Sequence, residues 1–160
     1  MNNVFCLLSA CTILAVTACK KEENEDPATT NYEFIDQPLQ GKINGESWTF
    51  VDGSAEEHGN YSVIMYEATY PNPCSSFSDA PNTSTVGFVR DDLQPGTYQL
   101  NMDQYMLIFD KEEGVNYLCT DGVYEILSID TAAQLLSGRV VIDFDRTTYM
   151  NGNFTIPVCF

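Results

Sequence analysis

The chain has few side chains that could act as a catalytic base. It contains one histidine, His58, and the surrounding residues 55–60 have the composition of a loop. Hydrolysis by an activated serine needs a base within hydrogen-bond reach of the nucleophile, and no Gly-x-Ser-x-Gly sequence occurs. We therefore predict that His58 is a solvated loop residue and that the chain is not an enzyme.

Carboxylates could carry out a second kind of chemistry. They lie near one another in sequence at residues 91–92, 112–113 and 143–145. Glycosidases place two carboxylates across a cleft, but in a chain with 23 acidic residues some lie close together in any fold. No EF-hand loop is present, and one histidine cannot form a transition-metal cluster. The sequence predicts no catalytic residue, no metal centre and no cofactor, and it leaves open a calcium site built from loop acids.

Aromatic side chains are the better indication of binding. Trp48, Tyr66 and Tyr70 could form a platform on which a sugar ring stacks. Trp48 lies beside Phe50 in one extended segment, however, which favours a core position for the indole. Tyrosine is also a common residue of β-sheets. These three residues are the candidate platform for a glycan or another small ligand.

The charge of the chain excludes some partners. It has 23 acidic and 7 basic residues, and its formal net charge is −16. Nucleic-acid binding needs a basic surface, so we predict no nucleic-acid partner. Peripheral binding to an anionic membrane is disfavoured for the same reason. The charge is typical of a protein kept soluble and repelled from an anionic cell surface.

Short β-rich segments separated by turn residues recur along residues 39–160. Asn44-Gly45 separates two of them and is a strong hairpin signal, and Pro95-Gly96 and Asp121-Gly122 indicate further turns. Residues 153–160 alternate apolar and other side chains, which predicts a strand with one buried face. About ten such strands predict an all-β domain, a single antiparallel β-sandwich, with a small β-barrel as the alternative.

The N-terminal part of the chain has a different composition. Residues 1–18 contain no Lys, Arg, Asp or Glu, and the apolar stretch within them is shorter than the roughly 20 residues that a membrane span needs. This length suits the hydrophobic region of a secretory signal. Residues 20–38 hold two lysines and six acidic residues, and little there can be buried. We predict a signal peptide at 1–18, a flexible acidic tether at 19–38 and the domain at 39–160.

Val16-Thr17-Ala18-Cys19 resembles the lipobox of bacterial lipoproteins, although the segment before it has no Lys or Arg. The resemblance implies a diacylglyceryl thioether on Cys19, cleavage before it, and acylation of the new amino terminus, with palmitate as the expected chain. Two or more acyl chains hold a protein stably at a membrane. Lys20-Lys21-Glu22-Glu23 resembles the export signal of Bacteroidota lipoproteins. It implies an outer-membrane protein exposed at the cell surface, with a periplasm-facing anchor as the alternative.

Six cysteines occur in the chain. Two lie in the predicted signal peptide, and Cys19 is the predicted lipid site. Cys74, Cys119 and Cys159 remain, and in an oxidising compartment they allow one disulfide and one free thiol. Their spacing is too wide for a CxxC metal or redox motif.

Four segments of the predicted domain resemble a group of small Bacteroidota lipoproteins that have no established activity. The segments are 43–49, 125–130, 137–140 and 151–159. Members begin with an Ile-Asn-Gly-x-x-Trp hairpin and end in a Gly-x-Phe-x-x-x-x-Cys strand. Cysteines recur in the group at the positions of Cys74 and Cys159, so the resemblance implies a disulfide between these two.

We therefore expect a lipid-anchored outer-membrane lipoprotein whose domain is a non-catalytic interaction or structural module, with an envelope protein as one possible partner. The alternative is a surface glycan-binding or small-ligand-binding domain. An exposed aromatic row in a groove would favour the alternative, and a buried Trp48 without a concave pocket would favour the first hypothesis. A cleft with two close carboxylates, one screened from water, would favour an enzyme. The sequence leaves the oligomeric state open.

Overall fold

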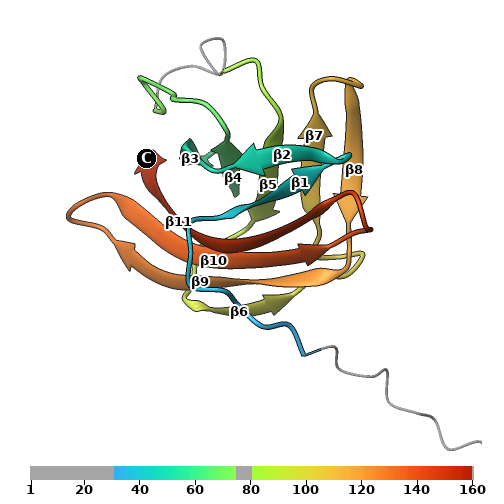
Figure 1. The fold of residues 1–160 in the computed structure, drawn as a ribbon. Coiled ribbons are helices and arrows are strands. Elements are labelled where there is room, and N and C mark those ends of the chain that lie inside the picture. The colour runs from blue at the N-terminus through green and yellow to red at the C-terminus, as the bar shows by residue number, and fades with distance from the viewer. Residues whose placement is uncertain (1–30, 75–80, 160) are drawn as a thin grey trace, which may run out of the picture. The chain divides into compact units, whose positions relative to one another are not determined.

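The computed structural model describes residues 31–74 and 81–159, so the predicted signal peptide and Cys19 lie outside the described residues. The described residues form eleven strands and no helix (Figure 1). The strands are β1 (Gln40–Ile43), β2 (Glu46–Thr49), β3 (Asp52–Glu57), β4 (Tyr61–Tyr66), β5 (Thr85–Arg90), β6 (Gly96–Gln99), β7 (Met106–Asp110), β8 (Val115–Cys119), β9 (Gly122–Asp130), β10 (Leu135–Asp143) and β11 (Tyr149–Cys159).

All of these strands belong to one mixed sheet. Its order is β6-β9-β10-β11-β3-β4-β5-β7-β8, and β1 joins it by pairing with both β11 and β2. Every pair of strands is antiparallel except β11 with β3, which is parallel. The sheet curls into a half-barrel (Figure 1). The prediction of an all-β domain is confirmed.

The expected antiparallel sandwich is wrong, and the length of β11 gives the physical reason. This strand pairs with β10 along residues 149–157, and on its other side it pairs with β1 near its start and with β3 at its end. One continuous ladder therefore joins strands that a sandwich would divide between two stacked sheets. Because strands twist as they pair, a single sheet with this many strands curls around its own apolar face.

The core fills the concave side of the curled sheet, and the alternation of β11 shows how the sequence builds it. Phe154, Ile156 and Val158 are buried, as the period-two pattern predicts, while the side chains between them are more exposed. Other strands contribute alternate residues in the same way. The buried core includes Val63, Met65, Val86, Phe88, Met106, Ile108, Tyr124, Ile126, Val140 and Ile142.

The β1–β2 hairpin has the predicted two-residue turn. Asn44 and Gly45 both have positive φ, at 50° and 87°, which a tight hairpin of this kind requires. Backbone N–H groups of the turn donate to the Thr147 carbonyl and the Thr148 hydroxyl, both in the loop before β11. These bonds fix the hairpin against the sheet.

The last residues of the segment predicted as a tether lie along β11. Asn151 accepts a hydrogen bond from the Ile35 backbone N–H and donates one to the Glu33 carbonyl, each at 2.9 Å. The Gln37 carbonyl accepts the Asn153 backbone N–H at 2.8 Å. The guanidinium of Arg139 lies 4.1 Å from the centre of the Phe34 ring. The folded domain therefore takes in residues before Leu39.

Candidate functional site

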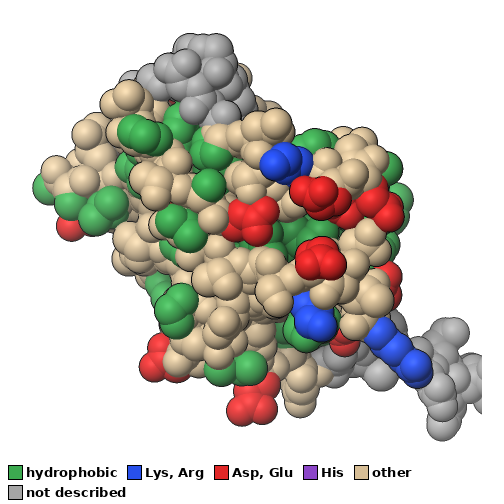
Figure 2. Space-filling model, turned by 45° about the horizontal axis from the view of Figure 1, so that its top comes forward, with side chains coloured by type: hydrophobic (Ala, Val, Ile, Leu, Met, Phe, Trp, Pro, Cys, Tyr) green, Lys and Arg blue, Asp and Glu red, His purple; other side chains and the backbone are tan. Residues whose placement is uncertain are grey.

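A cleft of about 540 Å³ opens beside the β1–β2 hairpin and the end of β7. Five of the side chains around it are acidic, and no lysine or arginine is among its described lining residues. The lining residues are Ile43, Asn44, Glu46, Ser47, Trp48, Glu67, Ser84, Asp110, Glu112 and Glu113. Figure 2 shows a face of the molecule on which several acidic side chains lie near one another, with apolar side chains between them.

Trp48 connects the cleft to the core. It is the buried residue of β2, with 1 % of its surface exposed, while its neighbours on the strand are exposed. Its indole N–H donates to the Ser84 carbonyl at 3.1 Å. This bond ties the hairpin to the segment before β5. The core position that the sequence favoured for Trp48 is confirmed.

The three residues of the candidate aromatic platform are buried in the fold. Tyr66 and Tyr70 are buried as well as Trp48, with 3 % and 2 % of their surfaces exposed. The two tyrosine rings pack edge to face against each other, with centroids 5.4 Å apart. Burial, with added effects from Tyr70 and Glu56, raises the pKa of Tyr66 to about 12. Since these rings face other protein groups, a sugar ring cannot stack on them.

Hydrogen bonds join three segments of the chain around the cleft. Glu67 follows β4, and its Oε1 accepts the Thr83 hydroxyl at 2.6 Å and the Ser84 backbone N–H at 3.2 Å. The Ser84 hydroxyl oxygen in turn accepts the Lys111 backbone N–H at 3.1 Å. The segments after β4, before β5 and after β7 are thereby held together around the cleft.

Asp110 ends β7 and has an unusual environment. It is 3 % exposed, and its Oδ1 accepts the backbone N–H groups of Glu112 at 2.9 Å and Glu113 at 3.4 Å. Its Oδ2 has no hydrogen-bond partner. Within residues 31–74 and 81–159, every other buried side-chain nitrogen or oxygen atom has at least one. A buried polar atom without a partner destabilises the fold by roughly 1–3 kcal/mol, and by more when it is charged.

Ion pairs do not neutralise the cleft. The ion pairs among the described residues join His58 to Glu56, Arg90 to Asp92 and Arg139 to Glu125. None of these carboxylates lines the cleft. The part of the chain that the structure describes also has no group of three or more side chains placed to hold a metal ion. The cleft therefore presents an acidic surface that attracts cations.

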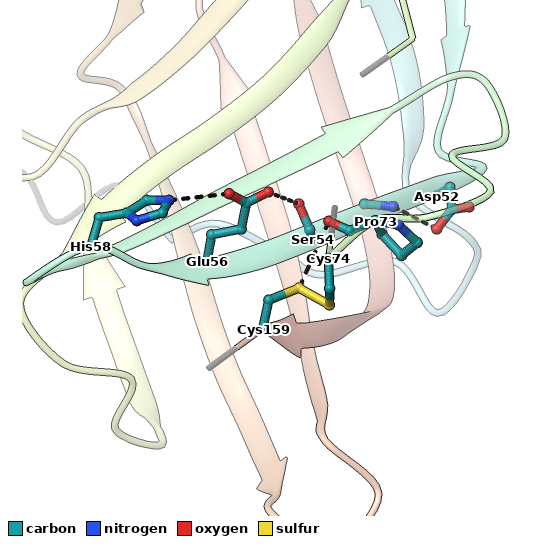
Figure 3. The surroundings of a disulfide bond; sticks show 8 residues. Asp52, Ser54, Glu56, His58, Pro73, Cys74 and Cys159 are labelled. Atoms are coloured by element: carbon teal, nitrogen blue, oxygen red, sulfur yellow. Dashed lines mark hydrogen bonds and ion pairs between the residues drawn. A yellow bond between two sulfur atoms is a disulfide. The ribbon is translucent and has the colours of Figure 1, made fainter. Parts of the chain in front are cut away.

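A second polar row runs along β3 (Figure 3). The Ser54 hydroxyl donates to Glu56 Oε1, and His58 Nε2 lies 3.2 Å from Glu56 Oε2. The glutamate stands between the serine and the histidine, whereas a hydrolytic triad has the histidine in the middle, where it can take the serine proton. His58 lies in a bend after β3 with 63 % of its side chain exposed, as its sequence context predicts.

Cys74 and Cys159 form a disulfide beside this row, with their Cα atoms 5.3 Å apart (Figure 3). This is the pairing that the resemblance to small lipoproteins implied. Cys119 is a buried free thiol. Burial, assisted by the negative charge of Asp145, raises the pKa of Cys119 to about 12.

No protein-family model matches the chain, and no curated protein or solved structure matches it. Within residues 31–74 and 81–159 there is also no helix that is long and apolar enough to cross a membrane. The function must therefore be inferred from the residues themselves.

Sequence reasoning found only part of the cleft. The pair Glu112 and Glu113 lines it, whereas the acids of 91–92 and 143–145 lie elsewhere. The importance of Asp110 was missed, although the charged turn that follows β7 was visible in the sequence. The burial of Asp110 depends on segments distant in sequence, such as those of Glu67 and Ser84. A local sequence pattern therefore does not predict that Asp110 is buried.

Proposed function

We propose that the chain is a lipid-anchored lipoprotein of the outer membrane whose domain is a non-catalytic module that binds a small ligand in the acidic cleft. The observation that carries this proposal is the unpaired, buried Oδ2 of Asp110, a residue that lines the cleft. Small-ligand sites commonly have volumes of roughly 300–1,000 Å³, and the cleft falls in this range. A donor group on a ligand would satisfy the unpaired oxygen.

The geometry favours a polar ligand over a stacked sugar. The rings of Trp48, Tyr66 and Tyr70 are buried, so the groups offered to a ligand are carboxylates and the polar side chains of Asn44 and Ser47. An enzyme is favoured less, although Asp110 is screened from water. Glu67 Oε1 and Asp110 Oδ1 each accept two hydrogen bonds from the protein, and His58 is not among the lining residues.

A binding experiment tests the cleft. Trp48 is the single tryptophan of the chain and lines the cleft, so its fluorescence reports occupancy. We expect members of a fragment library of mixed charge to change this emission. Ser47→Phe should abolish the change, because it fills the mouth of the cleft from an exposed position, whereas Thr49→Phe, on the same face of β2 but outside the cleft, should not. Absence of any fragment effect, or equal effects in both variants, would overturn the proposed binding.

A second experiment tests the lipid anchor and the exposure of the domain at the cell surface. In a Bacteroidota host, protease added to intact cells should remove the domain of the wild-type protein. Cys19→Ala should be missing from the membrane fraction, because it has no thiol for the lipid. If the domain is protected until the outer membrane is broken, the protein faces the periplasm and surface exposure is wrong.

A further inference from the structure

We infer that the ligand of the cleft carries a primary ammonium group, which donates a hydrogen bond to Asp110 Oδ2. This inference rests on the proposed function, because it names the chemical class of ligand for the same site. Either a lysine side chain or an amino sugar could supply the group.

The charge of the site calls for a cation. Asp110 is accompanied in the cleft by four other acidic side chains, and the described lining has no basic one. None of the five takes part in an ion pair among the described residues. In a chain of net charge −16, an anionic ligand would meet repulsion both at long range and inside the cleft. A neutral ligand would leave the carboxylates uncompensated.

The arrangement of oxygens disfavours a metal ion. Calcium takes 6–8 oxygen ligands, and the described residues bring no three carboxylates into a metal-binding group. Asp110 Oδ1 and Glu67 Oε1 are already used as acceptors of two hydrogen bonds each. The cleft, at about 540 Å³, has room for an organic cation and not only for a bare ion.

The same oxygens distinguish an ammonium from a guanidinium group. A guanidinium binds a carboxylate best as a fork that uses both oxygens. Asp110 offers one free oxygen, because Oδ1 caps the turn after β7. A single N–H donor from a compact ammonium group fits this arrangement.

Access to Oδ2 requires a small movement of the turn. Less than 1 Å² of this atom is open to solvent, so a ligand reaches it only when neighbouring atoms shift. This movement falls on the turn after Asp110, whose residues 111–114 are all exposed. The new hydrogen bond would compensate for the movement, because it pairs an atom that lacks a partner in the free protein.

The test is a calorimetric titration of the full chain, purified in detergent, with Trp48 fluorescence as the second readout. The probes for the two sources are Nα-acetyl-lysine methylamide and methyl glucosaminide. Their N-acetylated forms remove the charge, and the Nε-trimethylated lysine probe keeps the charge but has no N–H on the charged nitrogen. Asp110→Asn is the test variant, and Asp91→Asn removes an acid from an exposed position outside the cleft.

We expect at least one ammonium probe to bind, and acetylation, trimethylation and Asp110→Asn each to weaken binding at least tenfold, while Asp91→Asn leaves it unchanged. Which probe binds identifies the source. Equal binding of the acetylated or trimethylated form would overturn the inference and leave the proposed function standing. Binding of calcium chloride but of neither amine would also overturn it. If no fragment and no amine binds, the proposed function fails together with the inference. The comparison of probes on the wild-type chain decides the matter even if Asp110→Asn does not fold.

Discussion

At the scale of single residues, Asp110 combines two roles that oppose each other energetically. Its Oδ1 stabilises the turn after β7 by accepting two backbone N–H groups. Its Oδ2 is buried without a partner and destabilises the free protein. Binding sites commonly hold residues that lower stability in exchange for function. The side chain is therefore explained better by a ligand than by the turn alone.

Substitution of Asp110 separates the two roles. Asp110→Asn keeps the Oδ1 acceptor and removes the buried charge, but it puts an NH2 group in place of the unpaired Oδ2, so we expect the free energy of unfolding at neutral pH to change by less than about 1 kcal/mol. Asp110→Ala also removes the acceptor for the turn, and we expect a fall of roughly 1–2 kcal/mol relative to Asp110→Asn. Urea unfolding followed by Trp48 fluorescence measures both. An Asp110→Asn protein as unstable as Asp110→Ala would contradict this account.

The thiol of Cys119 should not react with alkylating reagents in the folded protein. Burial raises its pKa to about 12, so at pH 8 almost none of the thiol is ionised, and the thiolate is the reactive form. We expect iodoacetamide at about pH 8 to leave Cys119 unmodified until guanidinium chloride unfolds the protein, as measured by peptide mass spectrometry. Rapid modification of Cys119 in the native state would show that this thiol is accessible.

At the scale of elements, the loop between β10 and β11 supports the hairpin beside the cleft. Asp145 Oδ1 accepts the Thr147 hydroxyl and the backbone N–H groups of Thr147 and Thr148. The Thr148 hydroxyl then accepts the backbone N–H of Asn44 in the β1–β2 turn. The hydrogen bonds from Thr147 and Thr148 lower the pKa of Asp145.

This lowered pKa predicts a pH dependence with a defined sign. The folded value lies below the unfolded one, so the stabilisation is fully present above the unfolded pKa of about 3.8 and is lost as the pH falls through the folded value. We expect Asp145→Asn to lower the urea midpoint at neutral pH and the difference from wild type to shrink in strong acid. Asp91→Asn is the control for loss of one exposed charge. A difference that does not change with pH would exclude the titration of Asp145 as its cause.

The same elements show how much of the fold could be predicted from the sequence. The hairpin at Asn44-Gly45 and the alternation of 153–159 were predicted because a turn signal and a strand pattern are local. The parallel pairing of β11 with β3 was not predicted. It joins segments about a hundred residues apart, so no local sequence pattern indicates it. The cleft is non-local in the same way, since Glu67 and Asp110 come from different turns. Only Glu112 and Glu113, adjacent in sequence, could be seen as a pair.

At the scale of the whole molecule, a disulfide cross-links two distant parts of the chain. Cys74 and Cys159 are separated by 85 positions and lie at a long connection and at the end of β11. A cross-link of this kind stabilises mainly by restricting the unfolded chain. It also fixes the end of β11, whose parallel pairing with β3 comprises two residue pairs among the described residues.

Removal of the disulfide should therefore be costly. We expect the double variant Cys74→Ser and Cys159→Ser to lose about 2–4 kcal/mol of unfolding free energy. Guanidinium unfolding with and without a reductant measures the effect. The reductant should lower the midpoint of the wild-type protein and leave that of the double variant unchanged. A wild-type midpoint that is insensitive to complete reduction would contradict the role given to this bond.

The measurement that tests the central claim most directly is a crystal structure of the protein with the ammonium ligand that binds best in solution. The account predicts the ligand nitrogen at a hydrogen-bond distance of about 2.7–3.2 Å from Asp110 Oδ2, with the turn after β7 displaced to admit it. An amine bound elsewhere, or a cleft that stays empty while Oδ2 is paired with a protein donor, would contradict it.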